Sequence, residues 1–183
     1  MGRNRVRIIG GEWRSRSIAF PPRPDLRPTP DRVRETLFNW LGQDLSGRAC
    51  LDLFAGSGAL GFEAASRGAQ RVVMVERDPA IFRALAANRV HLRADAVELE
   101  KSDALEFLRH DGRLYDVVFL DPPFGAGYWP RLASLLPQRL APGAMVYHES
   151  GARLEPADGW GVWKEGRAGQ VNYQLLTKQT EGS

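Results

Sequence analysis

The segment Phe119–Gly125, FLDPPFG, places a carboxylate, two prolines and an aromatic ring at the end of an apolar run. The prolines end strand pairing because neither has a backbone N–H and each fixes φ. They leave Asp121 and Phe124 beside a rigid, extended backbone. Such a segment is either a structural corner or a slot that holds a flat, polar group.

A glycine-rich loop lies upstream, in the segment LDLFAGSGALG. Gly56, Gly58 and Gly61 have the G-x-G-x-x-G spacing between an expected strand and an expected helix. Glu76 ends the next expected strand, where an acid can bind ribose hydroxyls. The loop therefore predicts a cofactor that contains a nucleoside.

An acid before the loop separates two candidate cofactors. Asp52 would oppose the negative charges of a pyrophosphate but suits S-adenosylmethionine, which carries an ammonium and a sulfonium. Asp103 either accepts from the adenine amino group or only caps its helix. We therefore expect S-adenosylmethionine to bind at eight residues: Asp52, Phe54, Gly56, Ser57, Gly58, Glu76, Asp103 and Ala104.

With a methyl donor nearby, the corner can position an exocyclic amine of a nucleobase. Such an amine is a poor nucleophile because its lone pair is delocalised into the ring. Asp121 and the Pro122 carbonyl can each accept one N–H and direct the lone pair at the methyl group. Phe124 would stack on the base, and Pro123 would help to fix the acceptors. We expect these four residues to be catalytic.

Cysteine chemistry offers another route to a methylated base. Cys50 is the single cysteine and begins the first strand of the expected sheet, far from the ligand crevice, so we expect a small core residue. One cysteine excludes an intramolecular disulfide. Together with three scattered histidines, it also predicts no metal site.

Helix-like and strand-like segments alternate from Cys50 to Ser150. This pattern predicts a parallel sheet with helices on both faces. Two further strand-like runs without a helix between them, in residues 160–178, require at least one antiparallel strand at the end of the sheet. The expected class is α/β, with a Rossmann-like sheet.

The N-terminal region is strongly basic. Nine arginines against three acids give residues 1–34 a charge of +6, which leaves −3 for the rest of a chain whose net charge is +3. Arginine binds phosphate and stacks on bases, so the region favours nucleic acid, although a solubilising tail is the alternative. The candidate RNA contacts are Arg5, Arg7, Trp13, Arg14, Arg16 and Arg32.

The same region predicts a hairpin around Gly10–Gly11, followed by a proline-rich connector over residues 21–28. A helix should follow, with Thr29 as its N-cap. Trp13 either stacks on a base or anchors the hairpin to the core. We divide the chain into an arm, 1–28, and a domain, 29–183, and expect the domain to fold without residues 1–20.

The whole chain of 183 residues has the size of one domain with a small appendage. No apolar run approaches the roughly 20 residues of a membrane helix, and no signal-peptide pattern opens the chain. These features predict a cytoplasmic protein that does not associate with membranes.

Five segments together resemble the bacterial small-subunit ribosomal RNA guanine-N2 methyltransferase family (RsmD): RIIGGEWRSR, RPTPDRVRETLFNWL, LDLFAGSGALGFEAASRGA, FLDPPF and AGQVNYQL. The resemblance covers nearly the whole chain. It implies a class I methyltransferase with a seven-stranded, mostly parallel sheet and an antiparallel terminal strand.

The same resemblance implies transfer of a methyl group to a guanine N2 of 16S ribosomal RNA in a largely assembled small subunit, by a monomer whose hairpin touches RNA. Gly56 and Gly58 would line the cofactor loop, and Glu76 would bind the ribose. Asp103 would lie near the adenine. Residues 121–124 would hold the target base.

Three other functions remain open from the residues alone. One is a non-catalytic RNA-binding module that retains the cofactor fold, although the intact corner argues against it. An adenine-N6 methyltransferase of DNA or RNA could use the same corner, because the chemistry serves any planar exocyclic amine. A nicotinamide-dependent oxidoreductase could use the glycine loop, but Asp52, the corner and the basic arm would then have no role.

Overall fold

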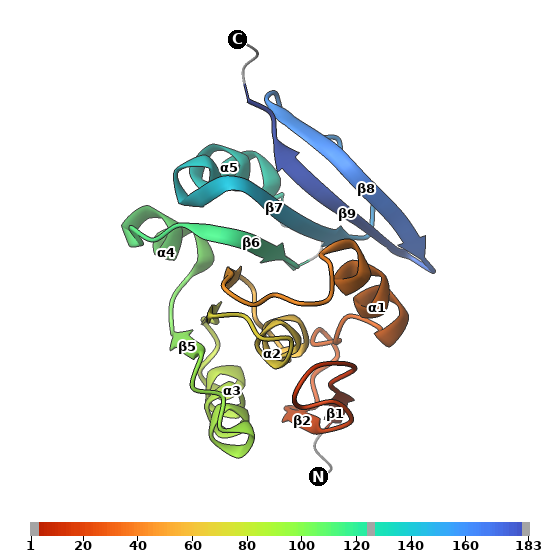
Figure 1. Cartoon of the computed structure of the whole chain (residues 1–183), viewed down its shortest axis with the longest axis vertical. Coiled ribbons are helices and arrows are strands. Elements are labelled where there is room, and N and C mark those ends of the chain that lie inside the picture. The colour runs from red at the N-terminus through yellow and green to blue at the C-terminus, as the bar shows by residue number, and fades with distance from the viewer. Residues whose placement is uncertain (1–3, 124–126, 181–183) are drawn as a thin grey trace.

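A seven-stranded sheet forms the centre of the molecule (Figure 1). The structure, a computed structural model, describes residues 4–123 and 127–180. The strands of this sheet are β3 (Ala49–Asp52), β4 (Arg71–Val75), β5 (Val97–Glu100), β6 (Tyr115–Leu120), β7 (Leu140–Ser150), β8 (Trp160–Ala168) and β9 (Val171–Lys178). The helices are α1 (Asp31–Trp40), α2 (Ala59–Ser66), α3 (Pro79–Leu92), α4 (Ala104–His110), α5 (Trp129–Leu135) and the 3-10 turn η1 (Leu136–Arg139).

The strand order is β5-β4-β3-β6-β7-β9-β8. Strands β5, β4, β3, β6 and β7 are parallel, and β9 pairs antiparallel with both β7 and β8. The expected α/β class and the antiparallel terminal strand are confirmed. This strand is the last in sequence but lies inside the sheet, so β8 and not β9 occupies the edge.

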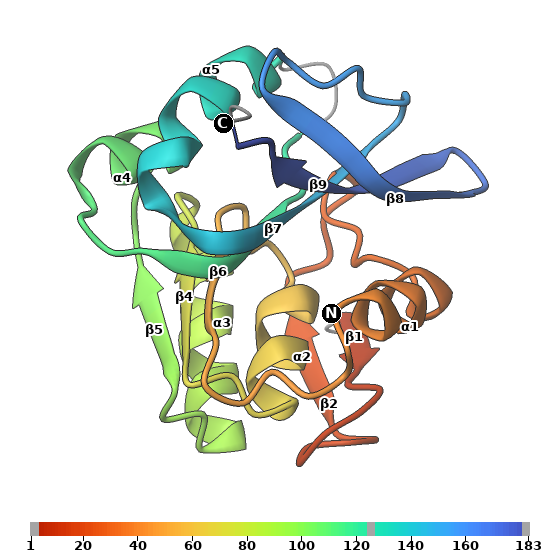
Figure 2. The same ribbon diagram turned by 45° about the horizontal axis from the view of Figure 1, so that its top comes forward.

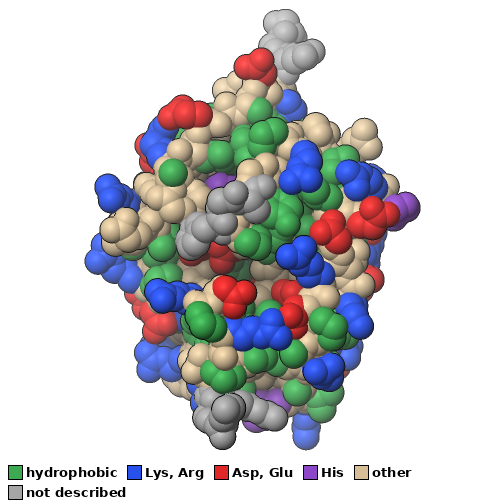
Figure 3. Space-filling model, turned by 180° about the vertical axis from the view of Figure 1, so that it is seen from behind, with side chains coloured by type: hydrophobic (Ala, Val, Ile, Leu, Met, Phe, Trp, Pro, Cys, Tyr) green, Lys and Arg blue, Asp and Glu red, His purple; other side chains and the backbone are tan. Residues whose placement is uncertain are grey.

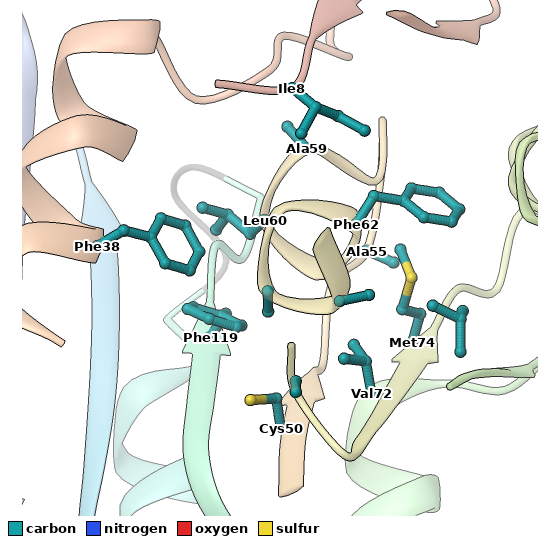
Figure 4. Close-up of a cluster of buried hydrophobic side chains, with 14 of the residues drawn as sticks. Ile8, Phe38, Cys50, Ala55, Ala59, Leu60, Phe62, Val72, Met74 and Phe119 are labelled. Atoms are coloured by element: carbon teal, nitrogen blue, oxygen red, sulfur yellow. The ribbon is translucent and has the colours of Figure 1, made fainter. Parts of the chain in front are cut away.

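Alternate residues of the strands face two different cores, because successive side chains of a strand point to opposite faces. Phe119 and Tyr147 pack with α1, α2 and α3, whereas Val118 and Val146 pack with α4 and α5. Figure 2 shows the helices on both faces of the sheet. In Figure 4, α2 lies between Ile8 of the arm and the strands, and Phe38 of α1 points toward Phe119.

The arm is an antiparallel pair, β1 (Asn4–Arg7) and β2 (Ser17–Phe20). The expected hairpin around Gly10–Gly11 is confirmed, but its strands are joined by a long loop, residues 8–16, that packs on the end of α2 and not by a turn at the two glycines alone. Gly11 has φ of 78°, and a Cβ there would lie 2.0 Å from the Ser66 carbonyl oxygen. The Ser66 hydroxyl accepts from the Trp13 N–H at 2.9 Å and donates to the Gly10 carbonyl at 2.6 Å.

Glu63 of α2 joins the arm to the domain. Its side chain is fully buried, and its carboxylate accepts from the backbone N–H groups of Ile9 and Gly10 at 3.0 and 2.8 Å. It also accepts from Arg34 at 3.2 Å and from Arg67 at 3.0 Å. Four donors compensate this buried charge, as burial requires.

Arg34 of α1 extends this network. It is 1% exposed and donates to the carbonyl oxygens of Thr29 at 3.0 Å and Arg7 at 2.8 Å, and to the Asp31 carboxylate. Arg34 is one of the nine arginines that give residues 1–34 their charge of +6. Its charge is compensated inside the molecule, so it does not contribute to a surface for nucleic acid.

The arm also contributes apolar side chains to the core that faces α1 and α2. The buried ones are Val6, Ile8, Trp13, Ile18 and Phe20. Trp13 is only 7% exposed, so it anchors the arm to the core. In this structure its indole is not free to stack on a base. This packing argues against the expectation that residues 1–20 can be removed from a folded domain.

The start of α1 differs from the expected cap. The helix begins at Asp31, Pro30 occupies the N-cap position, and no side chain caps it. The buried Thr29 hydroxyl instead donates to the Glu149 carboxylate of β7 at 2.8 Å. Over the described ranges 4–123 and 127–180, no helix is both long and apolar enough to cross a membrane.

We predict that Glu63→Ala lowers the free energy of unfolding by about 3–5 kcal/mol, because Arg34 and Arg67 lose a buried ionic partner and two backbone N–H groups of the arm lose their acceptor. Denaturant unfolding measures this loss. The control is Glu35→Ala in α1. This substitution removes an exposed carboxylate and should change the free energy of unfolding by less than about 0.5 kcal/mol. Equal stabilities of the two variants would contradict the role of Glu63.

Candidate functional site

Two predicted acids lie at the edge of the sheet where β3 and β6 end. Asp52 is the last residue of β3 and pairs with Phe119 of β6, and Asp121 follows the end of β6. The parallel strands therefore bring the two acids to one edge, at the point where the order of strands reverses. Ligands of open α/β sheets bind at this point.

Asp52 is 2% exposed, and its Oδ2 accepts from the Gly61 N–H at 3.0 Å. Burial raises the pKa of Asp52 to about 7; the bond from Gly61 opposes this shift, and the charge of Glu76 adds to it. A buried carboxylate with a single backbone donor is suited to a cationic partner, because a positive charge would favour its ionised form.

The glycine loop forms a close backbone cradle at the start of α2. Gly58 has φ of 86°, and a Cβ there would lie 2.6 Å from the Phe62 ring. The buried Ser57 accepts from the Ala59 N–H at 3.3 Å. Phe54 packs its ring edge-on against Tyr128, with centroids 5.1 Å apart. The loop conformation therefore requires glycine where the sequence places it.

Glu76 connects the end of β4 to this loop. Its Oε2 accepts from the Gly56 N–H at 3.0 Å, and its Oε1 accepts from the Asp78 N–H at 2.9 Å. The side chain is half-buried. Glu76 thus lies beside the loop, as the sequence predicts, but both of its oxygens have backbone donors.

The proline-rich connector also reaches this loop, which the sequence did not predict. Arg23 donates to the Asp78 carboxylate at 2.5 and 3.2 Å. Leu26 packs over Gly56, where an added Cβ would lie 3.1 Å from the leucine methyl. The connector therefore covers part of the predicted cofactor loop.

Asp103 caps α4. Its Oδ1 accepts from the Leu105 and Glu106 N–H groups at 2.9 and 3.1 Å, and Ala104 is the buried first residue of the helix. Asp103 therefore acts as the N-cap of its helix, which was one of the two roles considered from the sequence. The proposed contact of Asp103 with the adenine stays a prediction.

The corner after β6 is partly covered. Asp121 and Pro122 are half-buried and Pro123 is exposed, while Phe124 lies outside the described residues. Burial raises the pKa of Asp121 well above its ordinary value, and the charges of Glu149 and Asp52 add to this shift. In Figure 3, acidic side chains lie at a hollow in the middle of the face seen from behind.

Glu149 is a site residue that the sequence analysis missed. It is 5% exposed near the end of β7, one position after His148, which pairs with Leu120 of β6. Its Oε2 accepts from the hydroxyls of Thr29 and Tyr147, each at 2.8 Å. The sequence could have indicated Glu149, because it is an acid at the end of an apolar strand-like run and this strand neighbours the strand of Asp121.

Cys50 is fully buried in β3, and burial raises the pKa of its thiol to about 12, with the charge of Asp116 adding to the shift. The expectation of a core residue is confirmed. Within the part of the chain that the structure describes, no three His, Cys, Asp or Glu side chains form a group that could hold a metal ion.

All five candidate RNA-binding arginines are exposed: Arg5, Arg7, Arg14, Arg16 and Arg32. Two of them have partners on the surface, since Arg16 donates to the His91 carbonyl at 2.9 Å and Arg7 lies 3.8 Å from the Asp31 carboxylate. The backbone of the arm thus packs into the domain while these guanidinium groups remain accessible to a ligand.

Comparisons with known proteins agree with this geometry. Residues 6–177 match the family model described as Conserved hypothetical protein 95. The chain is 43% identical to Ribosomal RNA small subunit methyltransferase D of Escherichia coli (strain K12), over 99% of this chain and 94% of that protein. The solved structure of yhhF from Escherichia coli superposes with a TM-score of 0.86, at 42% identity, and covers 97% of this chain and 100% of the other.

A more distant structure shares the fold. The T. thermophilus 16S rRNA N2 G1207 methyltransferase (RsmC), in complex with AdoMet and guanosine, superposes with a TM-score of 0.72 at 23% identity and covers 98% of this chain and 50% of that one. The resemblance stated from the sequence is confirmed by the two Escherichia coli proteins. The chain belongs to the ribosomal RNA small subunit methyltransferase D family.

Proposed function

We propose that the protein transfers a methyl group from S-adenosylmethionine to the exocyclic N2 of a guanine in small-subunit (16S) ribosomal RNA. Membership of the methyltransferase family supports the reaction and the class of substrate. The observation that carries the chemistry is the pair of strand ends that bring Asp52 and Asp121 to one edge of the sheet. Asp52 would bind the positively charged cofactor, and Asp121 would accept a hydrogen bond from the amine of the base.

The residues present fit S-adenosylmethionine. Glycines at the start of α2 allow close approach of a ligand to the backbone, and the buried Asp52 suits an ammonium better than a phosphate. Glu76 and Asp103 would contact the ribose and the adenine. When bound, the cofactor supplies an electrophilic methyl group on a sulfonium.

The corner would hold the acceptor amine. Asp121 and the Pro122 carbonyl accept its two hydrogens and orient the lone pair, and the rigid Pro122–Pro123 backbone fixes both acceptors in advance. Phe124 would stack on the base. No strong base is required, because the amine becomes acidic only after it has gained the methyl group.

The five exposed arginines of the arm and α1 would bind RNA phosphates. Since the arm is fixed to α2 through Glu63, it would hold the RNA in one position relative to the corner. We propose that the substrate is the RNA within an assembled or assembling small subunit, and that the protein acts as a cytoplasmic monomer.

The alternatives lose support. A nicotinamide oxidoreductase is at variance with the methyltransferase family. Adenine-N6 methylation would use the same corner, but the relatives carry names of ribosomal RNA methyltransferases. Mass spectrometry of the nucleosides of small-subunit RNA, from cells with and without the protein, tests the choice: N2-methylguanosine should be lost, and a loss of N6-methyladenosine would contradict it.

We predict that Asp121→Ala reduces methyl transfer by about 10²–10³, because one fixed acceptor of the amine is lost. Binding of S-adenosylhomocysteine, measured by calorimetry, should remain unchanged, since Asp121 faces the base. Asp121→Asn keeps a carbonyl acceptor and should be milder. Loss of cofactor binding in the alanine variant would contradict this assignment.

We predict that cofactor affinity falls as the pH decreases from about 7 to about 5.5. The pKa of Asp52 is about 7 without a ligand, and a neighbouring ammonium would lower it, so binding below this pH must release a proton. Calorimetry with S-adenosylhomocysteine in buffers of different ionisation enthalpy measures the proton. Asp52→Asn should weaken binding and abolish the pH dependence, and a wild-type affinity that is constant over this range would refute the contact.

We predict that the triple variant Arg5→Ala, Arg14→Ala and Arg32→Ala binds small subunits more weakly, with a salt dependence reduced by about one per lost phosphate contact. Its stability should be unchanged because all three side chains are exposed. Arg109→Ala on α4 is the control. Identical salt dependence in the triple variant and the control would show that the arm does not contact RNA.

A further inference from the structure

Glu149 differs from the other buried carboxylate that binds several donors. In Glu63 both oxygens are used: Oε1 accepts from Gly10 and Arg67, and Oε2 accepts from Ile9 and Arg34. In Glu149 only Oε2 accepts, from Thr29 and Tyr147. Within residues 4–123 and 127–180, no donor bonds Oε1. The two oxygens of Glu149 therefore differ: Oε2 is held by two buried hydroxyl donors, and Oε1 is left to accept from a ligand.

The position of Glu149 places this oxygen at the corner. Asp121 and Glu149 directly follow Leu120 and His148, which are paired on β6 and β7. Both residues continue the face of Phe119 and Tyr147, since side chains alternate along a strand. The charge of Glu149 also adds to the effect of burial in raising the pKa of Asp121, as expected for adjacent carboxylates.

The two hydroxyls fix the carboxylate. Thr29 precedes α1 and Tyr147 lies on β7, so Oε2 is held from two different elements, and both donors are buried. With Oε2 held, the orientation of the carboxylate is set before any ligand arrives. Oε1 is then a preorganised acceptor beside the acceptor of Asp121.

Two neighbouring acceptors match one edge of guanine. Guanine presents the N1–H donor directly beside its N2 amine. Adenine presents an N1 lone pair beside its N6 amine, and a carboxylate would repel that lone pair. A site with one acceptor for the amine and a second for the adjacent N–H therefore selects guanine.

We propose that Glu149 determines base specificity by accepting the N1–H of the target guanine through Oε1, while Asp121 and Pro122 hold the N2 amine. This inference rests on the proposed function. It assigns a positioning role to Thr29, which precedes α1, because its hydroxyl holds the carboxylate that accepts the N1–H of the base.

The test replaces the target guanine with 2-aminopurine, which keeps the 2-amine but has a lone pair at N1. The modified nucleotide is first mapped by mass spectrometry, and small subunits are then reconstituted with ligated RNA that carries each base at that position. Wild-type protein should methylate guanine at least about 100-fold faster, in kcat/KM, than 2-aminopurine. RNA with 6-thioguanine, which keeps N1–H and changes only position 6, is the control and should remain a good substrate.

Glu149→Gln supplies the decisive comparison. The glutamine amide can donate to an N1 lone pair, so the preference for guanine over 2-aminopurine should fall at least about tenfold. Tyr147→Phe, which removes one donor to Oε2, should lower the preference less. The matched control Glu106→Gln, an exposed acid on α4, should keep the wild-type preference.

Each failure has its own signature. If Glu149 were only structural, Glu149→Gln would slow both bases by the same factor, which would overturn the inference. Thermal unfolding and S-adenosylhomocysteine binding show whether that variant folds. If it does not, the wild-type ratio of kcat/KM for guanine over 2-aminopurine is the test, and a ratio near one refutes the inference. If wild-type protein forms no N2-methylguanosine on guanine RNA, the proposed function itself fails.

Discussion

A single buried carboxylate, Glu63, joins the arm, α1 and the end of α2. Glu63 has no access to water, so it must have donors, and these come from three separate segments: the loop of the arm, α1 and Arg67, which follows α2. Removing any segment leaves part of the charge uncompensated. The need to compensate this buried charge therefore holds the arm against α2. This helix begins at the glycine loop, and its last residue contacts the arm.

This arrangement links two ends of one short helix. The start of α2 forms the cradle next to Asp52 and Gly61, and its end bonds to the arm at Ser66. The connector then returns to the cofactor loop, where Leu26 packs over Gly56, and Arg23 donates to Asp78 at the start of α3. The surface that would bind RNA and the loop that would bind the cofactor are thus parts of one packed unit, and not of two independent modules.

The parts that the sequence predicted are those with local signals. Strands and helices follow from hydrophobic periodicity, and the loop follows from glycines at positions that need positive φ or close packing, such as Gly58. Asp52 and Asp121 were each predicted as site residues, and the topology of parallel sheets brings their two strand ends to one edge. Cys50 was placed in the core by the same reasoning.

The parts that the sequence did not predict depend on partners far away in the chain. Arg34 lies 29 positions from Glu63, and Thr29 lies 120 positions from Glu149, so neither pair has a local pattern. Thr29 looked like a helix cap because threonine before proline is a common cap signal. Gly10–Gly11 looked like a hairpin turn, but packing against Ser66 determines its conformation. Trp13 looked equally suited to RNA and to the core.

The position of β9 has a consequence for folding during synthesis. This strand pairs with β7 on one side and β8 on the other, so β8, which is made first, has no neighbour in the sheet until β9 has left the ribosome. Thr29 likewise waits for Glu149. The contact between Thr29 and Glu149 spans 120 positions, and contacts of such long sequence separation form late and slowly. A nascent chain that ends before β9 would therefore expose one edge of β7, and only the addition of the last strand closes the sheet.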